Sequence, residues 1–421
     1  MKHDGRSAFA RQTQRRAIAA FAMIAALAGA ACSSLLDVDA PSRVRADNLN
    51  NPVYAQLLVK SAVGDFDCAF ASYIVTTGQV VDEFKAVNIS SAEASDYDRR
   101  SVSPARTQYA SNGCGGLGAI YQPISTAIWQ ADNVLELLSK WTDTEVPDRA
   151  RLSQTAQAYA GYGRIFLGEG FCSAAISGGP ELQPAAIFKQ ADSLFTVALG
   201  GSDTQISTLA RLGRARARLD MGNTAGALSD ALLVPAGFVQ YARYSDASNR
   251  SRNVVFNTNN FAENVSIDVQ NQDVAFGGVP DPRVAVLKTR DRASNGIDTV
   301  WVQLKYASLN ASIPLARYAE AQLIVAEVSG GQTAVDIINQ LHTAAGLPQF
   351  SSTDPVLIRD HVIQERAREL FLEGQRFFDF NRFTLPFNPP AGAPYWQGGT
   401  YGTTRCFPLP DLERDNNANI Q

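Results

Sequence analysis

Apolar residues recur at helical spacing along much of the chain, and prolines and glycines separate the segments that carry them. A segment that opens at Pro123 shows this pattern clearly, because its apolar side chains fall on one helical face. These positions are Ile124, Ala127, Ile128, Ala131, Val134, Leu135 and Leu138. Asn51 and Pro52 form a helix cap and a first-turn proline ahead of a similar segment. The pattern predicts a mainly α protein.

One pattern of small residues, arginine and leucine occurs twice with the same internal spacing. The first copy is Ala158, Gly161, Arg164, Leu167 and Gly170, and the second is Ala210, Gly213, Arg216, Leu219 and Gly222. A spacing of three keeps these residues near one helical face, where small side chains let a neighbouring helix approach. The terminal glycine suits a left-handed helix end. The repeat resembles the helical hairpins of tetratricopeptide repeats, whose stacks mostly bind other proteins.

A third hairpin is predicted between residues 315 and 347. Its first helix ends at Gly330 and Gly331, Thr333 caps the second helix, and Gly346 ends it. Each of these residues is of the type that helix ends favour. We therefore expect two or three helical hairpins in the chain.

The stretch from about 240 to 305 differs from the helical segments, because Asn and Asp cluster there. Short runs at 251–257, 265–269 and 299–305 are predicted to be strands or extended loops. Long loops on a rigid helical frame are where binding residues usually lie. This stretch is therefore a candidate binding region.

The N-terminus carries basic residues followed by an apolar run over residues 17–31. This pattern predicts a secretory signal peptide over residues 1–31. The run is shorter than the roughly 20 residues that a helix needs to cross a bilayer. Small residues lead into Cys32 and resemble a bacterial lipoprotein signal, in which Cys32 becomes the lipidated N-terminus. The alternative is simple secretion with Cys32 as a spare thiol.

The chain is mildly acidic, with 37 Lys and Arg against 41 Asp and Glu, and removal of the basic leader makes it more so. A nucleic-acid partner is not expected, because phosphate binding needs a basic face. Beyond Cys32, an even number of cysteines in an exported protein predicts two disulfides. The cysteines are Cys68, Cys114, Cys172 and Cys406. Sequence alone leaves several pairings open, and we prefer Cys68 with Cys114 and Cys172 with Cys406.

Metal binding is the weaker interpretation of the cysteines and histidines. No CxxC or HxxxH spacing occurs, and only His342 and His361 remain once the leader is removed. We therefore predict no metal site. Signatures of catalysis such as GxSxG, HExxH and GxxxxGK[ST] are also missing from the sequence.

The segment at 363–382 reads IQERARELFLEGQRFFDFNR. It resembles the ER-x-REL-x-x-EG-x-R-x-x-D-x-x-R signature of the SusD/RagB-like family. Supporting pieces stand in the family's order at 35–38, 281–283, 314–320 and 407–410. The resemblance is specific in the last third of the chain and general in character elsewhere.

This resemblance implies a mainly α, SusD-like fold in which tetratricopeptide-like hairpins pack against an irregular, loop-rich half. We expect residues 32–421 to form one unit with a helical part, 32–240, and a loop-rich part with the signature helices, 241–421. The resemblance also implies a lipid-anchored protein on the outer-membrane surface. It would capture glycans or other oligomers, an oligosaccharide or a peptide, and deliver them to a TonB-dependent, SusC-like transporter.

Neither a cofactor nor enzyme activity is implied by the resemblance. An alternative function is an envelope scaffold lipoprotein that uses its hairpins for protein–protein interaction. A secreted glycan hydrolase is the least favoured interpretation, because paired carboxylates at helical spacing give no sign of a cleft between them.

The signature itself is predicted to be structural. A helix begins near Pro355 with Asp354 as its cap, and charges of both signs follow at helical spacing. These charges are Glu365, Arg366, Arg368, Glu369, Glu373, Arg376, Asp379 and Arg382. We expect them to form ion pairs that fix the helix to its neighbours.

Ligand-binding candidates are aromatic and polar residues in segments without a regular pattern. Sugar binding needs flat apolar faces and polar side chains, and Tyr395 and Trp396 lie in a stretch rich in Pro and Gly, where we expect them to be exposed. Their alternative role is to pin the tail. Asp82, Glu83 and Arg100 are further candidates, in a charged loop that is otherwise a solvated connector. The remaining tryptophans, Trp129, Trp141 and Trp301, are expected to be packing residues.

Overall fold

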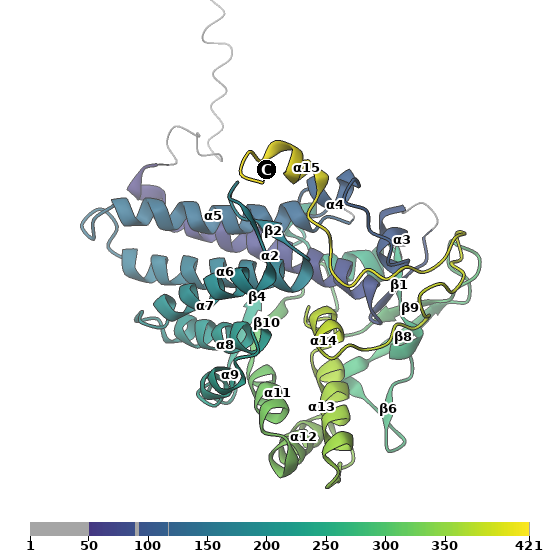
Figure 1. The fold of residues 1–421 in the computed structure, drawn as a ribbon. Helices are drawn as coiled ribbons and strands as arrows, with labels where there is room; N and C mark the ends of the chain where they lie inside the picture. Colours follow the sequence, from purple (N-terminus) through teal and green to yellow (C-terminus); the bar gives the residue numbers. More distant parts are fainter. Residues whose placement is uncertain (1–49, 89–91, 117, 421) are drawn as a thin grey trace, which may run out of the picture. The chain divides into compact units, whose positions relative to one another are not determined.

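The structure, a computed structural model, describes residues 50–88, 92–116 and 118–420 (Figure 1). The predicted signal peptide, residues 1–31, and the predicted lipidation site, Cys32, lie outside the described residues. All elements given below belong to one compact unit, Pro52–Gln421. Within the described ranges, no helix combines the length and the apolar character that crossing a bilayer requires.

The first half of this unit is a succession of packed helices (Figure 1). They are α2 (Ala55–Val80), α5 (Tyr121–Lys140), α6 (Arg149–Gly170), α7 (Pro184–Ala198), α8 (Thr204–Asp220) and α9 (Thr224–Ala231). A short 3-10 helix, η2 (Pro52–Tyr54), precedes α2, so the helical start predicted at Pro52 is confirmed. On α5, the predicted apolar stripe is buried apart from the half-buried Leu135.

The two copies of the sequence repeat lie on α6 and α8, and both pack against Phe195 of α7. A methyl group added to Gly161 would lie 2.6 Å from the Phe195 ring, and one added to Gly213 would lie 2.4 Å from it. The absent side chains therefore let both helices approach α7, as predicted.

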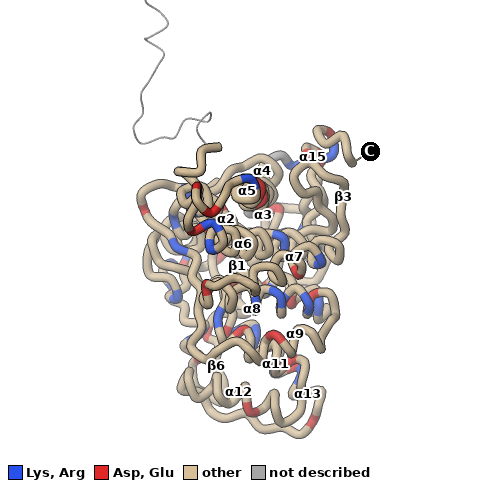
Figure 2. Tube along the Cα trace, turned by 90° about the vertical axis from the view of Figure 1, so that its left-hand side faces the viewer, with Lys and Arg blue, Asp and Glu red and all other residues tan. Residues whose placement is uncertain are grey.

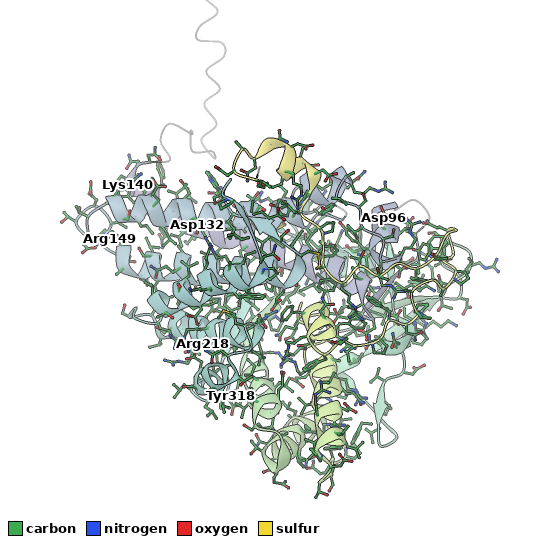
Figure 3. All side chains as sticks on the ribbon, in the orientation of Figure 1. Asp96, Asp132, Lys140, Arg149, Arg218 and Tyr318 are labelled. Atoms are coloured by element: carbon green, nitrogen blue, oxygen red, sulfur yellow. A yellow bond between two sulfur atoms is a disulfide. The ribbon has the colours of Figure 1, made fainter. Side chains whose placement is uncertain are left out.

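The arginines of the repeat form buried ion pairs with neighbouring helices. Arg164 donates to Asp132 of α5, at 2.7 Å and 3.1 Å, and Figure 3 labels this aspartate. Arg216 makes a two-pronged pair with Glu169 of α6, at 2.7 Å and 2.9 Å. The repeat thus supplies both close approach and ion pairing between helices.

The helix end predicted for the repeat is confirmed in one copy only. Gly222 takes a left-handed conformation, with φ of +75°. At Gly170 the prediction is wrong, because Phe171 continues in an extended conformation and pairs with Phe407 of the tail. Here the glycine serves close packing instead, since a methyl group on it would lie 3.0 Å from the Tyr73 ring.

Further ion pairs surround Asp230 of α9, which is buried. Figure 2 shows acidic and basic positions close together around α8 and α9. Arg214 binds both carboxylate oxygens of Asp230, at 2.8 Å and 2.7 Å. Arg218 adds a bond of 2.9 Å and also pairs with Asp192 of α7. One carboxylate thereby holds α9 against α8 and, through Arg218, against α7.

The third hairpin is confirmed as α11 (Tyr318–Ser329) and α12 (Gly331–Ala345). Gly330 separates the helices with φ of +60°, and Gly346 ends α12 in the left-handed region, as predicted. The cap predicted at Thr333 is wrong, because the Gly330 carbonyl already accepts from the Ala334 amide and α12 begins at Gly331.

The signature forms α13 (Pro355–Glu369) and α14 (Arg376–Arg382). The predicted cap is confirmed, because the Asp354 carboxylate accepts from the Val356 amide at 2.8 Å. A 3-10 helix, η6 (Pro282–Val284), contacts α13 and carries Arg283.

The described residues contain short antiparallel strand pairs, and most of their strands lie in the loop-rich part. They are β1 (Phe84–Ala86) with β5 (Val265–Ile267), β10 (Ile313–Arg317) with β4 (Val239–Ala242), β2 (Ala174–Ala175) with β3 (Glu181–Leu182), β6 (Ala275–Phe276) with β7 (Val279–Pro280), and β8 (Val286–Arg290) with β9 (Val300–Gln303). The strands predicted at 265–269 and 299–305 are therefore confirmed as β5 and β9.

The strand predicted at 251–257 is wrong. The chain there forms helical turns, η3 (Asn249–Ser251), α10 (Val254–Phe256) and the π-helical η4 (Asn257–Phe261). The Asn253 side chain accepts from the Phe256 amide at 3.0 Å and starts the helical turns. The other short elements are α3 (Ala92–Asp98), α4 (Thr107–Ser111), η5 (Val269–Asn271) and α15 (Asp411–Asn416).

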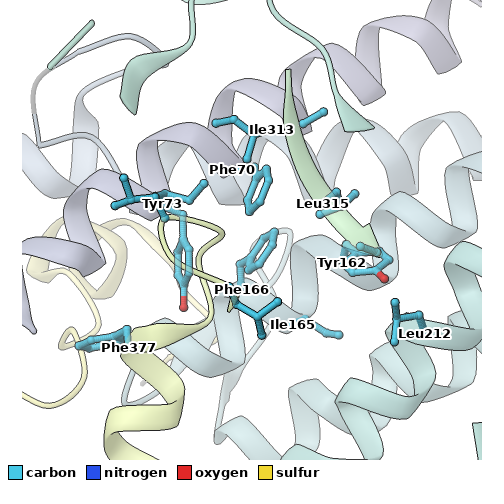
Figure 4. Packing of buried hydrophobic residues seen from close by; sticks show 14 of the residues in the cluster. Phe70, Tyr73, Tyr162, Ile165, Phe166, Leu212, Ile313, Leu315 and Phe377 are labelled. Atoms are coloured by element: carbon cyan, nitrogen blue, oxygen red, sulfur yellow. The ribbon is translucent and has the colours of Figure 1, made fainter. Parts of the chain in front are cut away.

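An aromatic cluster forms the centre of the core (Figure 4). Phe70 of α2 stacks on Phe166 of α6 with ring centres 5.2 Å apart, and Tyr73 lies 4.8 Å from the same ring. Leu315 of β10 and Phe377 of α14 belong to the same buried cluster. The core therefore joins the helical part to the signature helices.

Two disulfides connect distant segments, and they are the preferred pairs. Cys68 of α2 is bonded to Cys114, and Cys172, just after α6, is bonded to Cys406 in the tail. The second bond lies beside the Phe171–Phe407 bridge, where the Cys172 amide donates to the Phe407 carbonyl at 2.9 Å. It fixes the end of the chain to the helical layer.

The charges of the signature do fix α13 and α14 to their neighbours. Glu373 accepts from Lys305 at 2.6 Å and from Arg317 at 2.8 Å. Arg366 donates to Asp379 at 2.7 Å, and this aspartate also accepts from Arg382 at 2.7 Å. Most of these pairs join different elements. The predicted role of the charges, which is to fix the helices to their neighbours, is therefore confirmed, but their partners are seldom on successive turns of the same helix.

Candidate functional site

Two neighbouring cavities lie beside β1 and β5. The first has a volume of about 370 Å³ and lies between α13, α14 and η5. The second has a volume of about 250 Å³ and lies against β5 and the 388–401 stretch. Asp82 and Glu83 line the first cavity, and Val81 and Lys85 line the second, so one short segment contributes to both walls.

Asp82 and Glu83 are buried in the wall of the first cavity rather than solvated on a charged connector. Arg376 of α14 donates to Asp82 at 2.7 Å, and the Asn271 side chain donates to its carbonyl oxygen. Glu83 accepts from the Leu372 amide at 2.8 Å. The solvated-connector alternative is therefore wrong for these two residues, and their carboxylates shape the cavity from fixed positions.

Arg368 and Gln364 of α13 also line the first cavity, and neither was predicted from the sequence to contact a ligand. The Nη1 atom of Arg368 is buried and has no hydrogen-bond partner among the described residues. Gln364 is exposed, and Gln270 of η5 also lines the cavity. These side chains offer donors and acceptors to a polar ligand.

Arg100 lines the second cavity between two aromatic rings. Its guanidinium carbon lies 4.4 Å from the centre of the Phe387 ring and 4.5 Å from that of Tyr401. It donates to the Pro389 carbonyl at 2.6 Å. Burial lowers the pKa of Arg100, and the rings on either side hold the guanidinium in place.

Carboxylates from three segments line the second cavity together with Arg100: Asp98, Asp268 and Asp298. Lys85 pairs with Asp298 at 2.5 Å. Asp268 and Asp298 belong to the Asn- and Asp-rich stretch predicted as a binding region, but no local pattern indicates either residue individually. Composition was the only indication of these residues.

Tyr395 is buried, with 4% of its surface exposed, so its predicted exposure is wrong. Its hydroxyl donates to Asp98 at 2.9 Å, and its ring packs edge-on against Tyr401 at 5.1 Å. The Pro- and Gly-rich stretch turns back on itself there, because the Tyr395 amide bonds to the Gly399 carbonyl. Tyr395 therefore positions Asp98 at the second cavity.

Trp396 keeps part of its surface exposed beside Tyr395, with ring centres 5.7 Å apart. Its Nε1 atom is buried and has no hydrogen-bond partner among the described residues. Of the other tryptophans, Trp141 is buried and Trp301 packs against the core, as expected. Trp129 is 50% exposed, so its expected packing role is wrong, because the face of α5 with Ile128 and Ala131 is the one that turns to the core.

Several buried carboxyl groups around the cavities have pKa values above the usual range. Burial raises the pKa of Glu83 and of Asp98 to about 7, and that of Asp268 to about 6. In the unfolded chain these groups titrate near pH 4. Between these values the folded state binds more protons than the unfolded state, so stability falls as pH rises from about 4 to about 7.

We therefore expect the melting temperature to be at least about 3 °C higher at pH 5.5 than at pH 8. Glu83→Gln keeps an acceptor for the Leu372 amide and should reduce this difference. Thermal unfolding monitored by circular dichroism across this pH range provides the measurement. A melting temperature that stays level or rises toward pH 8 would contradict the assignment of protonated carboxyl groups.

Comparison with known proteins finds a family profile that matches part of the chain and solved structures that share its fold. Residues 251–419 match the profile of the SusD family. The starch-binding protein SusD of Bacteroides thetaiotaomicron is 33% identical over 120 residues, which cover 26% of this chain. The matched part spans 21% of the length of that curated relative.

Solved structures share the fold over most of the chain. A SusD homologue from Bacteroides thetaiotaomicron has a TM-score of 0.68 at 14% identity, covering 90% of this chain and 99% of that one. A SusD-like carbohydrate binding protein from Bacteroides vulgatus has a TM-score of 0.67 at 14% identity, covering 88% and 97%. The signature helices lie within the part of the chain that matches the SusD family profile, residues 251–419, and the fold is similar to SusD-like structures over most of the chain.

Proposed function

We propose that this protein captures oligosaccharides at the cell surface and delivers them to a TonB-dependent, SusC-like transporter in the outer membrane. In this proposal Cys32 is lipidated and holds the protein at the membrane, and the protein catalyses no reaction. The observation that carries the proposal is the pair of adjacent cavities lined by carboxylate, amide and guanidinium groups, with a partly exposed tryptophan nearby.

The chemistry of the cavities supports a ligand rich in hydroxyl groups. Carboxylates and side-chain amides accept and donate hydrogen bonds to hydroxyls, and an aromatic face packs on the apolar side of a sugar ring. The volumes, about 370 Å³ and 250 Å³, are near the lower end of the usual range for ligand pockets, roughly 300–1,000 Å³. The relatives named as starch-binding and carbohydrate binding proteins support the same class of ligand.

The buried carboxylates favour binding over hydrolysis. Asp82 is held by Arg376, and Glu83 is held by the Leu372 amide. A glycosidase needs two carboxyl groups that reach a scissile bond from opposite sides. Because Asp82 and Glu83 are bonded to other groups of the protein, we assign them a structural role in the cavity wall rather than a catalytic one.

Trp396→Ala tests the proposed ligand site. We expect calorimetric titration of the mature protein with a panel of soluble oligosaccharides to find a ligand, and the substitution to weaken its binding at least about tenfold, a loss of about 1.4 kcal/mol. Trp129→Ala is the matched control, because Trp129 is exposed on α5, a helix that contributes no residue to either cavity. Trp396, by contrast, contacts Tyr395, which bonds to Asp98 of the second cavity. Trp129→Ala should leave the affinity unchanged.

Loss of affinity in both variants, or in neither, would contradict a site beside Trp396. A panel that also contains peptides distinguishes the two proposed ligand classes. Delivery is tested separately, by isolating the protein from its own outer membrane. Recovery of a TonB-dependent barrel supports delivery, whereas recovery of other envelope proteins without a barrel would favour the scaffold function.

A further inference from the structure

A cluster of metal-ligating side chains lies apart from both cavities, between α12 and α13. It consists of His342 on α12 with His361 and Glu365 on α13. One possible ligand atom from each residue lies within 4.8 Å of the others. The chain has three histidines, and the third, His3, belongs to the predicted signal peptide. Both histidines of the mature chain therefore meet in one place.

The orientation of His342 suits a metal ligand. Its Nδ1 atom lies 2.6 Å from the Pro348 carbonyl oxygen, and because a carbonyl only accepts, this nitrogen carries the hydrogen. The Nε2 atom then faces the Glu365 carboxylate at 3.2 Å. In this tautomer a neutral imidazole would direct the lone pair of Nε2 at the negative Glu365 carboxylate, which is unfavourable. A proton or a metal cation between the two groups therefore stabilises the contact. A backbone carbonyl that fixes the tautomer in this way is typical of metal-bound histidines.

His361 has a buried ring nitrogen without a hydrogen-bond partner among the described residues, which also favours a ligand at this place. This nitrogen is Nε2, and the residue is 6% exposed. Its ring stacks flat on Phe350, with centres 4.0 Å apart and planes 5° apart, and meets Phe276 edge-on. Burial lowers the pKa of His361 to about 4, so its ring is neutral at pH 7. A buried nitrogen without a partner is costly, and a bound cation would satisfy it.

We propose that His342, His361 and Glu365 bind a divalent transition-metal ion, and that zinc fits the site best. Two imidazoles and one carboxylate are a donor set that zinc takes, with a water molecule in the fourth position. Zinc bonds of about 2.0–2.2 Å place neighbouring donor atoms roughly 3.4 Å apart. The distances between donor atoms therefore shorten by about 1.4 Å at most, through rotation of the rings and the carboxylate.

Arg283 and Arg368 are positive groups near the site, and the contacts of Arg283 are compatible with the ion. Arg283 bonds to the Oε1 atom of Glu365 through Nη1, and to the Oε2 atom through Nη2 at 3.2 Å. The Oε1 bond can remain while Oε2 turns to the metal. The carboxylates of Asp281 and Glu369 also contact Arg283 and offset its charge. The ion would connect the third hairpin to the signature helix.

The test uses the mature chain, purified without a histidine tag, so that no imidazole lies outside the site. Zn²⁺ is titrated by calorimetry, and Co²⁺ is followed by its visible absorption. We expect one ion per chain with a Kd in the micromolar range or below, a higher melting temperature with Zn²⁺, and the intense bands of tetrahedral Co²⁺.

Two variants isolate the site. His361→Phe keeps a ring that stacks on Phe350 and removes the nitrogen, and we expect it to weaken Zn²⁺ binding at least 100-fold. Asp360→Asn changes the neighbouring exposed residue of α13 and should leave binding unchanged. If His361→Phe fails to fold, His342→Gln replaces it. Absence of stoichiometric binding, or equal binding in the wild type and the histidine variants, would overturn the proposal.

Discussion

Replacing Cys172 and Cys406 by serine is expected to lower the free energy of unfolding by about 3–5 kcal/mol. The two cysteines are 234 positions apart in the chain, and a bond that closes so long a loop restricts the unfolded chain strongly. The chain-entropy account gives roughly 5.5 kcal/mol for this length, and measured losses typically reach 2–5 kcal/mol. Urea unfolding under non-reducing conditions provides the measurement.

The Cys68–Cys114 bond is the matched control, because its cysteines are only 46 positions apart. The same account gives about 4 kcal/mol for it, so its removal should cost less. The tail should also open first in the Cys172 variant, since Phe407 depends on its bonds to Gly170 and Cys172. Unchanged stability, or unchanged protease resistance of the tail, would contradict the role assigned to this bond.

Asp379→Asn is expected to destabilise the protein by about 3–5 kcal/mol, because it removes the charge that compensates two arginines. Arg366 and Arg382 each bond to this carboxylate at 2.7 Å, and both Arg366 and Asp379 are buried. An asparagine can face one guanidinium with its oxygen but presents its amino group to the other. Thermal and urea unfolding of the variant provide the measurement.

Asp143→Asn makes the same chemical change in an exposed ion pair. The Asp143 side chain is 74% exposed and bonds to Arg149 at 2.7 Å. Pairs of this kind contribute about 0–1 kcal/mol, so the control should unfold close to the wild type. Equal effects in the two variants would show that burial of the signature charges is unimportant for stability.

Helices, caps and disulfides were predictable because their determinants are close in the sequence or few in number. The α5 stripe, the Asp354 cap and the left-handed Gly346 follow from residue type and spacing within a few positions. The disulfides follow from a small even set of cysteines. Where a side chain intervened locally, as Asn253 does at the start of α10, the predicted strand became a helical turn.

The candidate site was predictable only in part, because its walls join residues that are far apart in the chain. Asp82 meets Arg376 across 294 positions, and Tyr395 meets Asp98 across 297. No local pattern indicates that Tyr395 is buried by such a contact. The same holds for His342 and His361, whose spacing matches no metal motif although packing of α12 on α13 brings them together.

Most charged side chains of the signature form ion pairs within the protein. Glu373 and Asp379 pair with neighbouring lysine and arginine side chains, and these pairs stabilise the helical frame. The second cavity draws its polar groups from loops that the motif does not include, such as 268–272 and 388–389. The motif therefore specifies the helical frame but does not specify the residues that line the second cavity. Under the proposed function, substitutions in those loops would change the ligand that is bound and leave the ion pairs of the helical frame unchanged.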